Sequence, residues 1–531
     1  GRYTWRAYDF EMCNWNPYYK QKEETTVTNE YNFSGQAWAD LEIIDGLHWN
    51  VKGATRYQAN KSKGFSAKNI YMLLYRDDAV KGYQNTSYMD RKDEETFYTN
   101  IHTYLDYAKT FGKHDIGAMV GYSNENNKYS WLSARRQNFS SPQTPEINAG
   151  SPSGQTNGGT SEEWSMQSVF GRVNYAFDSR YLFEANLRYD GTSRMASGNR
   201  WGVFPSFSAG WRISEEAFME SSKSWLNNLK IRASWGLLGN QDALDEYYPW
   251  MSTYNLDAKY LFGGEVNTGY YQKSYKLSTI GWEKARTWGI GLDATINNKI
   301  NISFDYYDRK TTGIIMDVPV PAEFGLDAYK DNVGAMANRG VELMVSYNNS
   351  WGDWKFGATA NMAYNKNELL DLGGVDYMTD PKNEYKRREI GKRFNSYYVY
   401  KADGFFSSDA DAQAYMDKYA GKDGYPFGSQ KFKAGDLIYK DANGDGKITA
   451  DDRVLAGSTD PTVTFALNLN AGYKGFDLSM LFSGAAGVHR MVDGGSVGTF
   501  SGDISHPASI WLDAWTPDNQ DATMPRIYYM Q

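Results

Sequence analysis

Residues 169–189 read VFGRVNYAFDSRYLFEANLRY. Apolar and aromatic side chains occupy the odd positions on both sides of a polar break at residues 178–180, and most even positions are polar or charged. Side chains alternate across a strand, so two such runs with a tight connection predict a β-hairpin. A single hairpin of this kind would also suit a soluble antiparallel sheet with one wet face, and the decision therefore depends on whether the pattern recurs.

The two-residue period recurs along the whole chain. It predicts about fourteen strands, many of them close to the ~9–11 residues with which a tilted strand crosses a bilayer. Short turns such as Asp45-Gly46 alternate with long polar connections along most of the chain, as in outer-membrane barrels. The expected strands are 37–44, 47–57, 96–109, 114–123, 169–177, 181–189, 207–213, 229–235, 288–296, 300–306, 341–347, 354–364, 465–473 and 476–482. The expected loops are 1–34, 61–95, 124–162, 240–278, 312–339, 371–460 and 488–531, with a short helix at 214–228.

Composition agrees with a large β protein. The 531 residues include 42 Tyr, 17 Trp, 25 Phe and 51 Gly, and the mean hydropathy is −0.66. No run approaches the ~20 apolar residues of a spanning helix. A net charge of −8 argues against a nucleic-acid partner. The single cysteine, Cys13, excludes an intramolecular disulfide and a thiol zinc cluster.

The polar faces of the expected strands carry many charges. Such side chains would be costly against lipid but suit a wet lumen, so we predict a transmembrane antiparallel β-barrel with long extracellular loops and short periplasmic turns. A soluble β-propeller or a chain of β-sandwiches is the alternative, although neither explains the alternation of short and long connections. The charged residues are Arg172, Glu184, Arg188, Arg212, Lys230, Arg232, Asp293, Asp305, Glu342 and Lys355.

Residues 441–452, DANGDGKITADD, form the sharpest local motif. They fit the D-x-N-x-D-G pattern of a calcium loop with an acid at the twelfth position. We predict a structural Ca²⁺ ion in the long insertion 371–460, and an Asx-rich turn without metal is the alternative. The expected ligands are Asp441, Asn443, Asp445, the carbonyl of Lys447, and Asp452, where Glu is usual.

Catalysis is not expected. The carboxylate pairs at 94–95, 162–163 and 215–216 are more typical of solvated faces or helix starts than of acid/base pairs. The Ser/Gly-rich residues 153–159 lack the lysine of a phosphate loop. Trp131, Trp164, Trp201 and Trp250 could stack on sugar rings or could simply pack a large surface.

Several long segments resemble the SusC/RagA class of TonB-dependent outer-membrane transporters of Bacteroidetes. NYAFDSRYLFEANLRYDGTSR and FPSFSAGWRISEEAF, within 172–218, resemble that family most closely. LKIRASWGLLGNQ (229–241), the segment 282–311, NVGAMANRGVEL (332–343) and the segment 435–461 are similar as well. The resemblance covers most of 163–487.

The resemblance implies a barrel of ~22 strands with a plugged lumen. It also implies a SusD-like lipoprotein lid, energy input from TonB–ExbB–ExbD, and import of an oligosaccharide or, less expectedly, a peptide. No plug domain, TonB box or closing strand is recognised in 1–531. We therefore expect these residues to be the middle and later part of a longer transporter wall.

Two readings of the function follow. The first is TonB-dependent import of a bulky nutrient without covalent chemistry, by a protein that contacts outer-membrane lipid. The second is a calcium-stabilised surface adhesin or binding protein built from β-sheets. A continuous apolar belt around one wall would separate the first reading from the second. A secreted glycan-degrading enzyme would need a carboxylate pair facing a cleft, which the sequence does not offer.

Overall fold

A computed structural model describes residues 24–66, 70–74, 80–84, 86–141, 145–242, 246–272, 275–318, 320, 323, 325–380, 383–491 and 509–527. Cys13 and the first part of the predicted loop 1–34 lie outside these residues. Among the described residues, no helix has the length and apolar character needed to cross a membrane.

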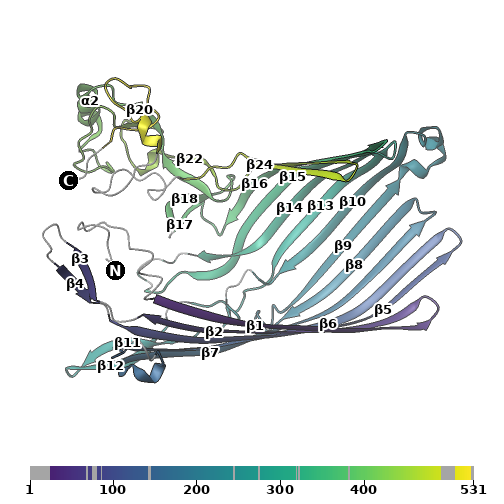
Figure 1. The fold of residues 1–531 in the computed structure, drawn as a ribbon, viewed down its shortest axis with the longest axis horizontal. Coiled ribbons are helices and arrows are strands. Elements are labelled where there is room, and N and C mark those ends of the chain that lie inside the picture. Colours follow the sequence, from purple (N-terminus) through teal and green to yellow (C-terminus); the bar gives the residue numbers. More distant parts are fainter. Residues whose placement is uncertain are drawn as a thin grey trace.

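Fourteen antiparallel strands form one curved wall, as the sequence pattern predicts (Figure 1). Each strand between the first and the last pairs with its predecessor and successor in the wall, so the order follows the chain. Within the described residues β1 and β24 are the two edges of this sheet. The strands are β1 (Glu24–Ile44), β2 (Leu47–Ser66), β5 (Tyr88–Phe111), β6 (His114–Gln137), β7 (Ser151–Phe177), β8 (Tyr181–Thr192), β9 (Trp201–Arg212), β10 (Leu226–Asn240), β13 (Glu283–Ile296), β14 (Ile300–Val318), β15 (Tyr329–Trp351), β16 (Trp354–Leu372), β23 (Val463–Tyr473) and β24 (Phe476–Ala486).

The connections alternate between two rims. Short turns join β1–β2, β5–β6, β7–β8, β13–β14, β15–β16 and β23–β24 at one rim, on the right of Figure 1, and long connections lie at the other. The hairpin that opens the sequence analysis is confirmed, with Phe177 paired to Tyr181 and Val169 to Tyr189. Asp178 and Ser179 turn it in the left-handed region, at φ 52° each.

Cross-strand pairing places apolar side chains in continuous rows on one face. One row runs through Leu41, Trp49, Leu105, Val120, Gly171 and Leu187. Another runs through Leu292, Phe304, Leu343, Met362 and Phe465. Many of these side chains are strongly exposed, such as Leu187 at 52%. In water so long an apolar surface would be unfavourable, whereas it suits contact with lipid.

Several predicted loops are strand in the structure. Parts of 24–34, 61–95, 124–162 and 312–339 extend β1, β2, β5, β6, β7, β14 and β15, which reach 19–27 residues in length. The sequence pattern did not reveal these extensions, because their side chains no longer alternate between facing lipid and facing the lumen. Ser, Asn, Thr and charged residues can occupy both faces there, while backbone ladders continue to hold the strands together.

The predicted helix at 214–228 is wrong. Two short 3₁₀ turns, Ile213–Glu215 and Ala217–Ser222, occupy its first half, and β10 begins at Leu226. Ser214 is buried instead of capping a helix, so the acidic start of the segment reflects ion pairing and not a helix N-terminus. The predicted loop 240–278 also contains a hairpin, β11 (Asn255–Phe262) and β12 (Glu265–Tyr271).

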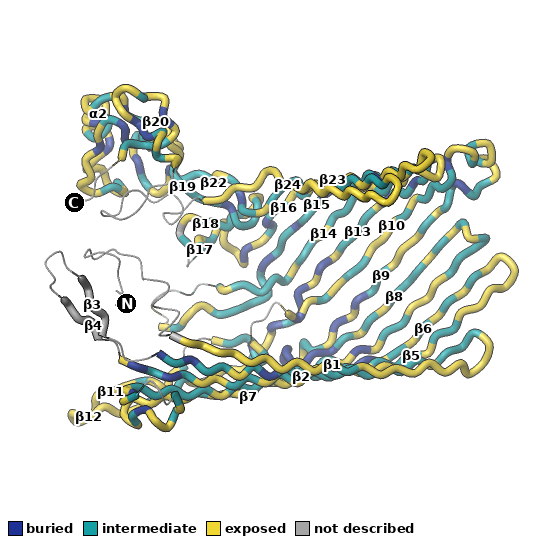
Figure 2. Tube along the Cα trace, viewed as in Figure 1, coloured by how far each residue is buried: buried dark blue, intermediate teal, exposed yellow. Residues whose placement is uncertain are grey.

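The connection between β16 and β23 forms a small folded unit of its own, at the long-connection rim. It contains a four-stranded sheet, β17 (Tyr377–Asp380), β18 (Asn383–Glu389), β19 (Ser396–Tyr400) and β22 (Arg453–Ser458). The pair β20 (Ala402–Phe405) and β21 (Leu437–Tyr439) and the helix α2 (Asp409–Tyr419) complete it. Phe406, Ala412 and Phe432 form its buried core. Figure 2 shows the contrast with the wall, most of which is exposed or intermediate.

Candidate functional site

The polar face of the wall carries the charges singled out from the sequence. Pairing places Arg212, Lys230 and Asp293 in one row across β9, β10 and β13. A neighbouring row runs through Gly210, Arg232, Gly291, Asp305 and Glu342. Because the opposite face is the apolar one, these rows line the inside of the wall. The predicted charged lumen is therefore an organised surface spanning several strands.

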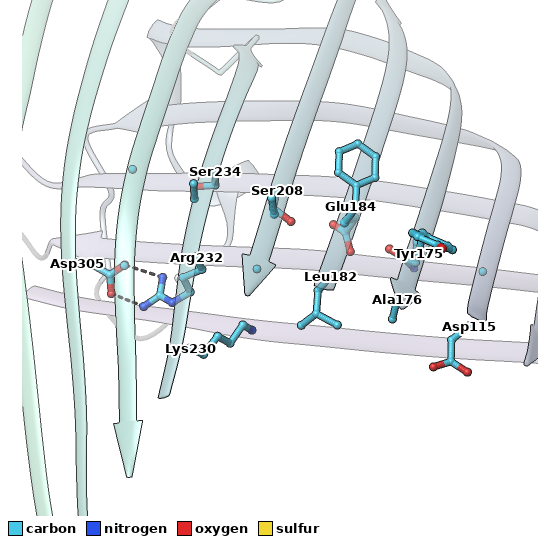
Figure 3. Close-up of a pocket in the computed structure, with 18 of the residues that line it drawn as sticks. Asp115, Tyr175, Ala176, Leu182, Glu184, Ser208, Lys230, Arg232, Ser234 and Asp305 are labelled. Atoms are coloured by element: carbon cyan, nitrogen blue, oxygen red, sulfur yellow. Dashed lines mark hydrogen bonds and ion pairs between the residues drawn. The ribbon is translucent and has the colours of Figure 1, made fainter. Parts of the chain in front are cut away.

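Arg232 lies at the centre of this surface (Figure 3). Its Nη1 and Nη2 donate to the two carboxylate oxygens of Asp305 at 2.6 Å each, and its Nε donates to Asp293 at 2.9 Å. Ser303 Oγ donates to Asp293 at 2.8 Å. Two carboxylates thus hold one guanidinium in a fixed fork, the geometry in which arginine binds carboxylate most strongly.

A hollow of about 900 Å³ opens on the inner face beside Arg232. Figure 3 shows charged, hydroxyl and apolar side chains around it. Its charges are nearly balanced, with four acids (Asp115, Glu184, Asp305, Glu342) and three bases (Lys109, Lys230, Arg232). Such a surface can form many hydrogen bonds to a polar solute without selecting a sign of charge.

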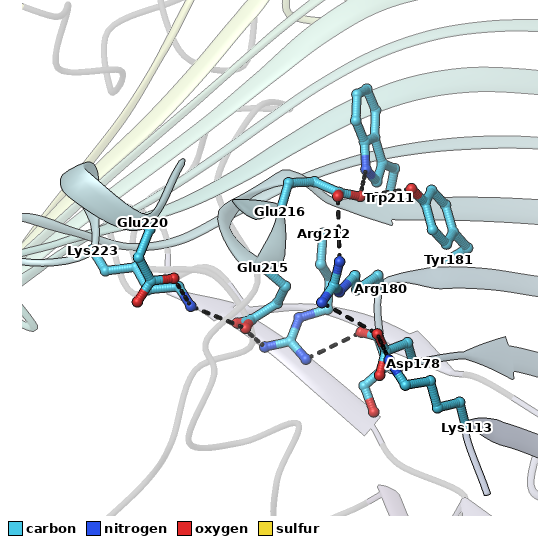
Figure 4. Close-up of polar contacts among 11 residues, drawn as sticks. Lys113, Asp178, Arg180, Tyr181, Trp211, Arg212, Glu215, Glu216, Glu220 and Lys223 are labelled. Atoms are coloured by element: carbon cyan, nitrogen blue, oxygen red, sulfur yellow. Dashed lines mark hydrogen bonds and ion pairs between the residues drawn. The ribbon is translucent and has the colours of Figure 1, made fainter. Parts of the chain in front are cut away.

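A second polar network ties the turns together at the short-turn rim (Figure 4). Glu216 accepts hydrogen bonds from Tyr181 Oη at 2.7 Å and from Trp211 Nε1 at 3.0 Å, and pairs with Arg180 at 3.4 Å. These bonds hold the pKa of Glu216 below its ordinary value. Asp178 joins the same network through Arg180 at 3.2 Å, and its hydrogen bond from Lys113 at 3.0 Å holds the pKa of Asp178 below its ordinary value. The rim therefore has a fixed arrangement of turns, with aromatic rings at the level of the membrane interface.

The structure shows which of the four tryptophans singled out from the sequence lie on the inner face of the wall. Trp131 and Trp164 lie on the inner face of β6 and β7, opposite Glu94 and Asn127. Trp201 stacks on Tyr189 with ring centroids 4.7 Å apart, on the outer face. Trp250 lies in the connection between β10 and β13. Only Trp131 and Trp164 of the four are therefore on the wall's inner face.

The predicted calcium ligands come together in one tight loop, where they accept backbone hydrogen bonds. Asp441 accepts from the N–H groups of Gly444 and Gly446 at 2.7 and 2.9 Å. Asn443 accepts from Asp445 N–H at 2.9 Å, and Asp445 accepts from Lys447 N–H at 2.8 Å. The loop therefore has the Asx turns of the metal-free alternative as well as the residues of the calcium pattern.

Asp452 holds this loop from inside. It is fully buried and accepts from the N–H groups of Ala442 and Thr449 at 2.7 Å each. In the part of the chain that the structure describes, no three His, Cys, Asp or Glu residues are grouped in a way that could hold a metal ion. Calcium at Asp441, Asn443, Asp445, Lys447 and Asp452 therefore stays a prediction.

Comparison with known proteins shows which family the chain belongs to. Residues 2–486 match the family model described as TonB dependent receptor-like, beta-barrel. The chain belongs to this family. It is therefore an outer-membrane protein whose strands cross the bilayer, and the predicted localisation is confirmed. The family is one of transport receptors, which agrees with the prediction that the protein is not an enzyme.

Its relatives show which TonB-dependent receptors this chain is similar to. It is 30% identical to the TonB-dependent receptor SusC of Bacteroides thetaiotaomicron, over 71% of this chain and 36% of SusC. It is 28% identical to TonB-dependent receptor P26 of Formosa agariphila, over 96% of this chain and 50% of that receptor. The RagAB peptide transporter has the same fold, with a TM-score of 0.81 and 22% identity over all of this chain and 56% of that one.

These matches confirm the resemblance to the SusC/RagA class. The chain spans about half the length of the first curated relatives it matches. The apolar belt and the family together exclude the adhesin reading and the soluble propeller. Sequence reasoning identified the charged residues of the inner wall but missed which of them pair. Arg232 and Asp305 are 73 positions apart, and only the strand register brings them together.

Proposed function

We propose that this chain forms much of the wall of a TonB-dependent transporter that imports a bulky nutrient. The observation that carries the proposal is the pairing of an apolar outer belt with a continuous polar inner wall on the same fourteen strands. A solute in such a conduit exchanges its water for hydrogen bonds to the wall, while the belt seals the wall against lipid. No covalent step is part of this function.

The proposed solute is an oligosaccharide. Trp131 and Trp164 support this choice, because indole faces on an inner wall can stack on the apolar faces of sugar rings. Hydroxyl and amide side chains such as Ser208 and Asn174 line the hollow beside Arg232 and could bind sugar hydroxyl groups. A peptide is the second candidate, since the RagAB protein of the same fold is described as a peptide transporter.

A SusD-like surface lipoprotein is the proposed partner of the long-connection rim. The SusC relative and the RagAB neighbours support this partner by analogy of class. Energy input is proposed to come from TonB–ExbB–ExbD acting through parts of the protein outside residues 1–531. A structural Ca²⁺ ion in the loop 441–452 remains part of the proposal.

Uptake in the source bacterium tests the proposal. Cells that lack the gene should lose import of a fluorescent oligosaccharide, such as labelled maltoheptaose, and should regain it when the full-length gene is returned. Collapse of the proton gradient should abolish this import if it depends on TonB. Loss of labelled peptide import alone would favour the second candidate. Unchanged import of both would contradict a role in nutrient uptake.

A further inference from the structure

A second hollow lies on the inner face, on the strands β2 and β5–β9. It measures about 620 Å³, and its lining includes Lys52, His102, Phe170, Arg172, Asn186 and Arg188. Strand register confirms that these positions share one face. Phe170 pairs with Arg188, Arg172 with Asn186, and Lys52 with His102. The hollow is therefore a surface built by the wall itself.

This hollow differs from the one beside Arg232 in its charge. Lys52, Arg172 and Arg188 line it, and no Asp or Glu among the described residues does. The larger hollow has four acids against three bases. Three like charges on one concave surface repel each other and attract counter-ions, most strongly where the surrounding wall has a low dielectric constant.

Within the described residues only one of the three cations forms an ion pair. Arg188 pairs with Asp190 at 3.0 Å and lies over the ring of Phe170, 5.4 Å from its centroid. Arg172 Nε donates to the neutral Asn186 Oδ1, at 2.7 Å. Within the described residues, neither Arg172 nor Lys52 forms an ion pair.

Other acids of the inner face lie near the hollow and accept hydrogen bonds from neutral donors, as Glu184 does from Asn186 Nδ2 at 2.8 Å. Glu125 accepts a hydrogen bond from Tyr98 Oη at 2.9 Å, and Asp106 accepts from Asn50 Nδ2 at 2.7 Å. Within the described residues none of these acids forms an ion pair with Lys52 or Arg172, so both cations keep N–H groups available to an incoming anion.

We infer that this hollow is a carboxylate-binding subsite, and that the imported oligosaccharide carries uronate groups. The inference rests on the proposed function. Arginine presents two parallel N–H groups that match a carboxylate, which a neutral sugar lacks. Trp38 lies directly opposite Lys52 on β1 and is 73% exposed, so a ring face is available beside the cation. An aromatic face next to a cation suits a sugar ring that bears a carboxylate.

The same chemistry has a second possible source. An Asp or Glu side chain of the protein itself, from a part outside the described residues, would fit the two cations equally well. The two sources differ in what happens when Arg172 or Lys52 is replaced. A bound substrate would lose affinity, whereas an internal carboxylate would leave substrate affinity unchanged and loosen the protein.

Binding to the full-length protein in detergent tests the inference. The probes are tetragalacturonate and, as the neutral sugar of equal length, maltotetraose. Arg172→Gln and Lys52→Met should each weaken tetragalacturonate binding about tenfold and should leave maltotetraose binding unchanged. Raising the salt concentration should weaken only tetragalacturonate binding. Lys355→Met is the matched control, because Lys355 is also an inner-face lysine and forms no ion pair within the described residues.

The outcomes separate the sources. If Arg172→Gln and Lys52→Met leave both sugars unaffected but lower the thermal unfolding midpoint and raise ion conductance in planar bilayers, the carboxylate belongs to the protein. If both variants match Lys355→Met in every measurement, the hollow binds no carboxylate and the inference is wrong. Failure of the proposed function has a different result, since wild-type cells would then import neither sugar whatever the purified protein binds.

Discussion

Arg232 on β10 and Asp305 on β14 are joined by two hydrogen bonds of 2.6 Å across the strand that lies between them. The residue of β13 in the same row is Gly291. A Cβ atom at Gly291 would lie 2.5 Å from Arg232 Cζ and 2.6 Å from Asp305 Oδ1. Because Gly291 has no side chain, the Arg232 guanidinium has space to lie across β13 and reach Asp305.

Gly291→Ala should break this ion pair. The new methyl group would push the guanidinium away from Asp305, which leaves two carboxylates on the inner wall with a poorly placed cation. We expect the free energy of unfolding to fall by about 1–3 kcal/mol, the usual effect of losing a hydrogen-bonded charged partner. Denaturant unfolding of the full-length protein in lipid measures it. Gly53→Ala is the control, because a Cβ there meets nothing within 4 Å; equal effects of the two substitutions would contradict the prediction.

Acid should loosen the short-turn rim through Glu216. Its pKa in the folded protein is below the ordinary value of 4.5. The stabilising contribution is therefore present above pH 4.5 and is lost as the pH falls through the lowered value. Glu216→Gln should flatten the pH dependence of the unfolding midpoint in this range. Glu220→Gln, in the 3₁₀ turn that directly follows Glu216, should keep the wild-type dependence. If the two variants have the same pH profile, Glu216 does not hold the rim in this way.

Calcium should stabilise the insertion between β16 and β23 if the loop 441–452 binds it. The expected result is slower trypsin cleavage of the insertion in CaCl₂ than in EGTA. Asp445→Asn should remove the difference, while Asp451→Asn should keep it because Asp451 lies outside the predicted ligand set. Asp452 is unsuitable for this test, because its buried carboxylate accepts backbone hydrogen bonds with or without metal. Equal cleavage rates in both buffers would favour the Asx turn alone.

The segment 509–527 should detach from the insertion when Gly435 is replaced. Arg526 N–H donates to the Gly435 carbonyl at 2.9 Å, and the ring of Trp515 lies against Gly435. Gly435 also has φ of +84°, which side chains rarely adopt. Gly435→Val should expose 509–527 to limited proteolysis, as seen by mass spectrometry of the fragments. Gly428→Val is the control, because it has φ of +55° but no neighbour within 4 Å. Identical fragments from the two variants would show that backbone strain alone is responsible.

The sequence was most informative where the membrane constrains it. In the bilayer each position of a strand faces either lipid or lumen, so neighbours such as Leu187 and Arg188 must differ in polarity. This alternation revealed the fourteen strands of the wall. Beyond the bilayer both faces are wet and the constraint ends, so the strand residues at both ends of the predicted loop 124–162 could not be recognised as strand. The inner charges could be assigned to a face, but their partners depend on register. Arg172 and Arg188 were both found from the sequence, whereas their gathering with Lys52 in one hollow could not be.

The length of β5 and β6 determines how far the wall rises above the bilayer. Each has 24 residues, which at ~3.3 Å per residue is ~80 Å of strand. A tilt of ~40° leaves a height of ~60 Å, more than twice the ~25 Å apolar band of a barrel. The entrance on this side therefore stands ~35 Å clear of the hydrocarbon region. In the proposed transporter, a large polymer would therefore meet the wall well above the lipid head groups, and the height of the wall, as well as its width, would limit which molecules enter.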